Sequence, residues 1–215
     1  MAAAARVVAG RALMHPAAKP LVFVLALLPF GWLLWGAVAG ALGANPAEAL
    51  IRSTGEWALR FLCIGLAVTP LRVMLRLPTL QRLRRMLGLF AYFYVVLHFV
   101  AYAWLDMGFY LDEIVRDIPK RPFILVGFAA LVLLTLLAAT SFDRAVRWLG
   151  AARWQALHRL VYAATLLGLL HFFWMRASKN NLGEVGIYAA VIVLLLGWRV
   201  WHRWSGRRRE PALRA

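Results

Sequence analysis

Residues 86–105 read MLGLFAYFYVVLHFVAYAWL, and this stretch decides the fold. It holds no Asp, Glu, Lys or Arg, and at about 1.5 Å per residue a helix of this length crosses the roughly 30 Å hydrocarbon core of a bilayer. One imidazole side chain, that of His98, lies inside it. Together with five further, largely apolar stretches it predicts six membrane-spanning helices: 21–42, 57–77, 86–105, 122–140, 158–174 and 185–201.

The overall composition agrees with a membrane protein. Hydrophobic residues make up 63% of the 215 residues and charged residues 16%, whereas soluble domains average roughly 45–50% and about 25%. This excludes a disordered chain and disfavours a soluble fold. The single cysteine, Cys63, lies in an apolar run, so we expect no disulfide and no iron–sulfur cluster held by this chain alone.

The charges are sorted by side. A net charge of +16 is typical of nucleic-acid binding when it is clustered in a domain. Here the termini, the connection between spans two and three and that between spans four and five carry 18 of the 25 cations, and the other three connections carry seven of the nine acids. The positive-inside rule therefore predicts that both termini are cytoplasmic. Because the basicity is a topology signal, we expect contact with lipid and no nucleic-acid partner.

These patterns predict an all-α integral membrane protein, a six-helix transmembrane bundle with both termini cytoplasmic. Residues 1–20 are expected to form a cytoplasmic N-terminal segment, residues 21–201 the transmembrane domain and residues 202–215 a basic cytoplasmic tail. The first apolar run is too long for a cleaved signal peptide, so we expect it to remain as a span. No loop is long enough to hold a soluble domain such as a Rossmann-type nicotinamide or flavin domain.

Three of the five histidines, His98, His158 and His171, lie within the predicted spans. Ionisable residues inside a membrane are energetically expensive, and imidazole is a common axial ligand of heme iron. His98 lies 13 residues beyond Arg85, where its span enters from the cytoplasm, and His171 lies 13 residues beyond His158, which puts both about 20 Å deep. Two imidazoles at one level, on helices that run in the same direction, can hold a heme b between them. The competing interpretation is that each is a hydrogen-bonded packing residue.

His158 lies about one heme spacing nearer the cytoplasm, which indicates a second heme without an obvious second ligand. Met86, His202 and a water molecule are candidates for that ligand, and a single heme is the alternative. On an ideal helix, 13 steps of about 100° leave the His158 and His171 side chains about 140° apart. The fifth span must therefore bend or bulge, or the two sites must face different neighbours.

Motifs around these histidines resemble those of a known family. Residues 54–57 read TGEW, residues 84–89 read RRMLGL and residues 154–162 read WQALHRLVY. With the spacing of the three histidines, this pattern over residues 20–201 closely resembles the MsrQ (YedZ) family. Its members are heme-binding membrane subunits of the bacterial periplasmic protein-methionine-sulfoxide reductase system. The family is part of the ferric-reductase-like transmembrane group, which includes the NADPH oxidases.

The resemblance implies a transmembrane electron carrier in the bacterial inner membrane. Such a protein takes electrons from the quinone pool and passes them through heme b to MsrP, a periplasmic partner with a molybdopterin cofactor. MsrP reduces methionine sulfoxide and so repairs oxidised periplasmic proteins. The implied iron ligands are His98, His158 and His171, for one or two hemes. FMN is a second implied cofactor, and the sequence does not reveal its site.

The residues also indicate a cofactor-dependent function without the resemblance. The chain has no nucleophile–base dyad, no metal-type carboxylate cluster and no phosphate loop, so we expect a non-catalytic electron-transfer subunit of an oxidoreductase complex. One alternative is a self-sufficient transmembrane ferric or metal reductase. Another is a redox-inactive transporter or scaffold, which is disfavoured because the sequence lacks paired intramembrane carboxylates and matching halves.

Two further predictions concern the periplasmic side. Thr54, Glu56 and Trp57 are expected to cap the second span, with Glu56 placing negative charge in its first turn. Presentation of Glu56 to a partner is the alternative. The acidic, amphiphilic loop of residues 106–121 is the expected docking surface for the partner.

Overall fold

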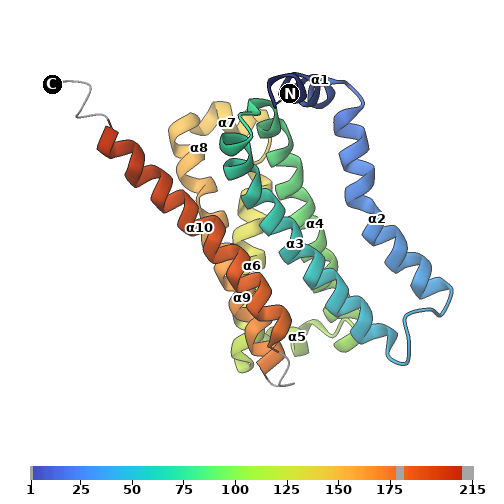
Figure 1. The fold of residues 1–215 in the computed structure, drawn as a ribbon. Helices are drawn as coiled ribbons and strands as arrows, with labels where there is room; N and C mark the ends of the chain where they lie inside the picture. Colours follow the sequence, from blue (N-terminus) through green and yellow to red (C-terminus); the bar gives the residue numbers. More distant parts are fainter. Residues whose placement is uncertain (1, 178–181, 210–215) are drawn as a thin grey trace.

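The computed structural model of the chain describes residues 2–177 and 182–209, and every regular element within those ranges is a helix (Figure 1). The predicted all-α class is therefore confirmed. Six segments of the structure are long and apolar enough to cross a membrane, and each overlaps one of the six predicted spans: Ala18–Val38, Pro46–Met74, Pro78–Asp106, Pro122–Ala139, Ala151–Ala177 and Gly183–Ser205.

Short helices mark the two ends of the bundle. Helices α1 (Ala2–Met14) and α7 (Asp143–Leu149) lie at one end, here called the α1 end, and α5 (Leu111–Lys120) lies at the other, the α5 end (Figure 1). Four spans are single helices: α2 (Ala18–Val38), α3 (Pro46–Met74), α6 (Pro122–Ala139) and α10 (Gly183–Arg209). The third span consists of the 3-10 helix η1 (Pro78–Leu83), helix α4 (Arg84–Ala101) and the π-helical turn η2 (Tyr102–Asp106). The fifth span consists of α8 (Ala151–His158) followed by α9 (Leu160–Ala177).

Helix α3 begins well before the predicted span. Asn45 caps it, because its side-chain oxygen accepts a hydrogen bond from the backbone N–H of Glu48 at 3.1 Å. Pro46 follows at the first helical position, where its missing N–H has no partner to lose. The prediction that residues 54–57 cap this helix is therefore wrong. Thr54 lies within the helix and donates its hydroxyl to a carbonyl of the preceding turn at 2.7 Å.

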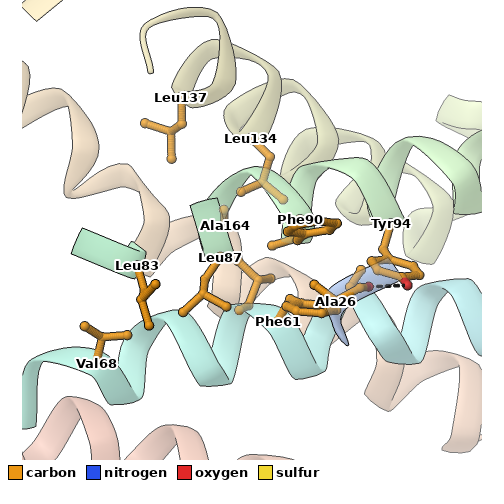
Figure 2. Close-up of a cluster of buried hydrophobic side chains, with 13 residues drawn as sticks. Ala26, Phe61, Val68, Leu83, Leu87, Phe90, Tyr94, Leu134, Leu137 and Ala164 are labelled. Carbon is orange, nitrogen blue, oxygen red and sulfur yellow. Dashed lines mark hydrogen bonds between the residues drawn. The ribbon is translucent and has the colours of Figure 1, made fainter. Parts of the chain in front are cut away.

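The core of the bundle includes Tyr94, which is fully buried and lies at one end of the cluster drawn in Figure 2. Helix α3 packs mainly on α4, and α6 packs mainly on α9. The ring of Phe61 stacks on that of Tyr94 with 5.3 Å between centroids, and it lies 5.7 Å from that of Phe90. The buried members of this core are Ala26, Ala58, Phe61, Leu62, Val68, Leu83, Leu87, Phe90, Ala91, Tyr94, Leu134, Leu137 and Ala164.

Tyr94 also attaches the peripheral helix α2 to the bundle. Its hydroxyl donates to the carbonyl of Ala26 at 2.8 Å, the dashed line in Figure 2, and accepts from the N–H of Phe30 at 3.1 Å. Pro29 lies inside α2, and a proline within a helix leaves backbone groups of the neighbouring turn without helical partners. Tyr94 therefore binds α2 at the turn where the backbone hydrogen bonds of α2 are interrupted by Pro29.

The fifth span is broken. Helix α8 ends at His158 and α9 begins at Leu160, so the helix is interrupted at Arg159. The 13-residue spacing between His158 and His171 predicted that this span bends or bulges, or that the two histidine sites face different neighbouring helices. The interruption lies between the two histidines: His158 ends α8 near the α1 end, and His171 lies within α9 towards the α5 end.

Candidate functional site

His98 of α4 and His171 of α9 face each other in the half of the bundle near the α5 end. Their ring centroids are 5.9 Å apart, and the ring planes are inclined at 75°. The prediction that these two histidines lie at one level is confirmed. Both rings are half-buried, and both line a cavity inside the bundle.

A backbone carbonyl of a neighbouring helix holds each imidazole. Nδ1 of His98 lies 2.8 Å from the carbonyl oxygen of Ile51 in α3, and Nδ1 of His171 lies 2.7 Å from that of Phe123 in α6. A carbonyl oxygen only accepts, so in the neutral ring Nδ1 carries the proton and Nε2 keeps its lone pair. Metal-binding histidines have this arrangement, because the second contact fixes the tautomer and the orientation of the ring.

A glycine lies behind each ring, four residues after the carbonyl that holds it. It is Gly55 in α3 and Gly127 in α6. A Cβ at Gly55 would lie 3.0 Å from Nδ1 of His98, and a Cβ at Gly127 would lie 2.8 Å from Nδ1 of His171. Both distances are shorter than a normal contact. A larger residue at either position would therefore push the imidazole away from its carbonyl.

The cavity has a volume of about 600 Å³ and lies between α3, α4, α6 and α9. Cofactor sites typically measure roughly 300–1,000 Å³. The inner wall is apolar and includes Leu62, Val95, Phe128 and Leu134. Towards the α5 end the lining becomes polar and charged. We call this part the charged rim, and it consists of Asn45, Glu48, Arg52, Glu56, Tyr102, Asp106, Arg121 and Arg176.

These residues fit a b-type heme. Two metal–imidazole bonds of about 2.0–2.1 Å, the length found for zinc, together with the two ring radii need roughly 6 Å between ring centroids. The observed separation of His98 and His171 is 5.9 Å. Two neutral imidazoles are suitable axial ligands for heme iron. An apolar wall with a charged rim also matches a cofactor whose macrocycle is apolar apart from two propionates.

His158 lies apart from this pair, at the junction of α8 and α9. Its Nε2 is 3.1 Å from the hydroxyl oxygen of Thr140, and its ring stacks on Trp154 with 4.0 Å between centroids. Trp154 in turn donates its indole N–H to the carbonyl of Thr140 at 2.8 Å. The ring of His202, a candidate second ligand, stacks on Trp198 at 4.8 Å. The structure therefore brings together two of the three predicted ligands and holds the third elsewhere.

Glu56 belongs to a charged cluster that the sequence analysis missed. Its carboxylate accepts hydrogen bonds from Arg60 at 3.0 Å and from Arg176 at 2.9 Å. The side chain of Arg176 is only 6% exposed and also contacts Glu184 of α10. Arg60 donates in addition to the hydroxyl of Tyr188 at 3.1 Å. A buried cation needs such partners, and the triad of Glu56, Arg176 and Glu184 links α3, α9 and α10 beside the cavity.

Comparison with known sequences assigns the family. A family model described as "Ferric reductase like transmembrane component" matches residues 54–169. A protein of Polaromonas naphthalenivorans named "Protein-methionine-sulfoxide reductase heme-binding subunit MsrQ" is 67% identical over 92% of this chain and 90% of its own length. This chain belongs to the MsrQ family. MsrQ proteins of Bordetella pertussis and Herminiimonas arsenicoxydans are 53% and 49% identical, over 90% and 91% of this chain and 93% and 89% of their own lengths. No solved structure matches the chain.

The residues matched by the family model include Gly55, His98, Gly127 and His158, and the match ends shortly before His171. The two glycines and the two carbonyls behind the histidines were not identified from the sequence. For Gly127, the available signal was a glycine inside an apolar helical stretch, which lowers helix stability and usually has a packing reason. That signal does not say which side chain fills the space beside the glycine, because the neighbour comes from another helix.

Proposed function

We propose that this chain is a transmembrane electron carrier that binds heme b between His98 and His171 and serves a methionine sulfoxide reductase. One observation carries the proposal: two imidazoles that line a cavity of about 600 Å³ have ring centroids 5.9 Å apart, and each has Nδ1 on a backbone carbonyl. Within the described residues, Nε2 of neither ring has a hydrogen bond. The MsrQ relatives are named as heme-binding subunits, which supports the same cofactor.

The residues of this chain bind and orient the cofactor, and heme iron when bound supplies the one-electron chemistry. The carbonyls of Ile51 and Phe123 keep a proton on Nδ1 of each imidazole, so both rings present the same nitrogen in either redox state. The apolar wall of the cavity excludes water and lowers the local dielectric. Because the ligands are held by helices, little rearrangement accompanies the gain or loss of an electron.

The proposed direction of transfer follows from the charges. The cation-rich connections, helix α1 and the C-terminal end of α10 lie at the α1 end, which the positive-inside rule assigns to the cytoplasm of a bacterial inner membrane. The cavity then lies in the periplasmic half. Electrons from membrane quinones would travel towards it, and His158 near the α1 end remains the proposed ligand of a second heme. Binding there requires Nε2 of His158 to leave Thr140, or the other nitrogen to be used.

The proposed partner is MsrP, a periplasmic molybdopterin subunit that reduces methionine sulfoxide in oxidised proteins, which makes this chain a non-catalytic subunit. Residues 106–121 support this role as a docking surface beside the charged rim. Phe109, Leu111 and Val115 are exposed there, next to the acidic Asp112. FMN as a second cofactor and quinones as the electron donors rest on the family resemblance, which assigns no residues to either.

Optical spectroscopy tests the cofactor. Purified full-length protein from heme-replete cells should show b-type bands in a dithionite-reduced minus oxidised spectrum. Well-folded protein without these bands would contradict the proposal. A reduced quinol analogue should then reduce the same heme, and oxidised MsrP should reoxidise it. Reduction by dithionite but not by quinol would leave the heme site standing and exclude the quinone as donor.

A self-sufficient ferric reductase is the second candidate, favoured by the description of the matching family model. A ferric chelate added to the quinol-reduced protein without any partner separates the two functions. Steady turnover of the chelate by this chain alone would support the metal reductase. The electron-carrier proposal expects fast reoxidation by MsrP and slow reoxidation by the chelate.

A further inference from the structure

We propose that Arg52 and Arg121 bind the two propionates of the heme, one arginine on each side of the charged rim. This inference rests on the proposed heme site and adds the orientation of the cofactor within it. Arg52 lies in α3, Arg121 directly precedes α6, and both line the cavity. Each is next to a peptide that holds an imidazole, since Arg52 follows Ile51 and Arg121 lies two residues before Phe123.

The cavity wall orients the cofactor. The propionates are the only charged groups on a heme, and burial of a carboxylate among apolar side chains without a partner is very unfavourable. The inner wall between α3, α4, α6 and α9 is apolar, whereas the charged rim lies only towards the α5 end. The propionate edge must therefore point towards the α5 end, where arginine is available.

The three arginines of the rim differ in how fully they are paired. Arg176 is 6% exposed and already held by two carboxylates, those of Glu56 and Glu184. The side chains of Arg52 and Arg121 are 46% and 48% exposed. The guanidinium groups of Arg52 and Arg121 are therefore accessible to a further anion, whereas that of Arg176 is already bound by two carboxylates.

The ion pairs of the two accessible arginines leave room for a propionate. Arg52 lies 3.8 Å from the carboxylate of Glu48, which is longer than a hydrogen bond. Arg121 uses Nε to contact Asp117 at 2.8 Å, and its two terminal amino groups have no hydrogen bond in the described part of the chain. A guanidinium can bind a carboxylate through two parallel hydrogen bonds, so each arginine can hold one propionate.

The acids of the rim do not cancel this attraction. Glu56 is neutralised by Arg60 and Arg176. Of the other two rim acids, Asp106 is exposed to solvent and the side chain of Glu48 is 40% exposed, so solvent and salt screen their repulsion. A propionate on the edge of the cavity lies beside low-dielectric wall, where its attraction to a guanidinium is stronger.

A comparison of heme with its dimethyl ester tests the proposal, because the ester lacks both propionate charges. Full-length apoprotein from heme-deficient cells, in lipid nanodiscs, is titrated with each compound, and binding is followed by the b-type absorption bands. The wild-type protein should bind heme at least about tenfold more tightly than the ester, a difference of about 1.4 kcal/mol. In the Arg52→Gln/Arg121→Gln variant the ratio of the two dissociation constants should fall close to one.

Arg116→Gln is the matched control, because Arg116 is an exposed arginine of α5 outside the cavity wall. It should keep the wild-type ratio. Because the readout is a ratio within each variant, a general loss of affinity does not imitate the expected result. If the double variant kept the wild-type ratio of dissociation constants, the assignment of the propionates to Arg52 and Arg121 would be wrong. If the wild-type ratio itself were near one, the protein would not recognise the charge of the propionates at all. Absence of b-type bands with both compounds would overturn the heme site itself, and the propionate assignment with it.

Discussion

The two histidine regions of the bundle hold their imidazoles in opposite ways. Near the α5 end, His98 and His171 bind carbonyls through Nδ1 and leave Nε2 free beside a shared cavity. Near the α1 end, His158 contacts the hydroxyl of Thr140 through Nε2, and Trp154 covers its ring. A metal-binding imidazole needs one nitrogen anchored and the other free. The first region is therefore preorganised for a metal, whereas the second must rearrange before Nε2 can bind one.

The ion pairs follow the same division. At the α5 end, Arg176 is buried between Glu56 and Glu184. At the α1 end, Arg85 and Asp143 form a pair at 2.6 Å with side chains 43% and 74% exposed. Buried pairs are costly to break and exposed pairs contribute little. The helices around the cavity are therefore held more firmly by charge than the connections at the α1 end.

Removal of the histidines should have the largest effect on heme binding, and it tests the difference between the two histidine regions most directly. His98→Ala and His171→Ala each remove a proposed axial ligand, so each should abolish the heme of the cavity. His158→Ala should leave the bands of that heme unchanged and lower total heme only if a second heme is bound. Heme per mole of protein, measured by the pyridine hemochrome method, checks both statements. Full heme content in both His98→Ala and His171→Ala would exclude this pair as the ligands.

The glycine behind His171 should have the next largest effect. Gly127→Ala places a methyl group 2.8 Å from Nδ1 of His171, so the ring must leave the carbonyl that fixes it. Loss of such a supporting contact typically lowers metal affinity about 10–100-fold. Gly65→Ala is the control, because a Cβ there meets nothing within 4 Å. Equal heme affinity in the two variants would show that the close approach at Gly127 has no role in binding.

The triad around the buried Arg176 should affect stability more than cofactor chemistry. Glu56→Gln removes one of the two carboxylates that contact Arg176 in the described part of the chain and should lower the free energy of unfolding by about 1–3 kcal/mol. The matched control is Glu48→Gln, since Glu48 is 40% exposed and its contact with Arg52 is 3.8 Å long. Exposed pairs contribute less than about 1 kcal/mol. Thermal unfolding of both variants in one detergent measures the difference, and equal losses would contradict the special role of the triad.

The exposed pair at the α1 end should have the smallest effect, and one that depends on pH. The hydrogen bond and the positive charge of Arg85 hold the pKa of Asp143 below its usual range. A carboxyl group whose pKa is lower in the folded state stabilises the protein above its unfolded pKa, about 3.9, and loses this contribution as the pH falls through the folded value. Asp143→Asn should therefore lower the Tm slightly at pH 7 and leave it unchanged in stronger acid. A larger difference in acid than at pH 7 would contradict this sign.

Hydropathy and helix geometry predicted much of this molecule because they depend on local properties. The six spans follow from runs of apolar residues, and the common level of His98 and His171 follows from a constant rise per residue. The start of α3 was not predicted, because the charged residues Glu48, Arg52 and Glu56 lower the hydropathy of this stretch and favoured its assignment to a loop. In the structure, the Asn45 cap and pairs such as Glu48 with Arg52, four residues apart, carry the helix through this stretch.

The sequence by itself determined how many helices cross the membrane and at what depth the histidines lie. Only the tertiary structure decided what each imidazole does with its two nitrogens. Those contacts join His98 to a carbonyl 47 residues away and His171 to one 48 residues away, and they need a glycine on the facing helix. The physical reason is that rise and hydrophobicity are properties of a single helix, whereas the direction of a ring is set by the backbone of its neighbour.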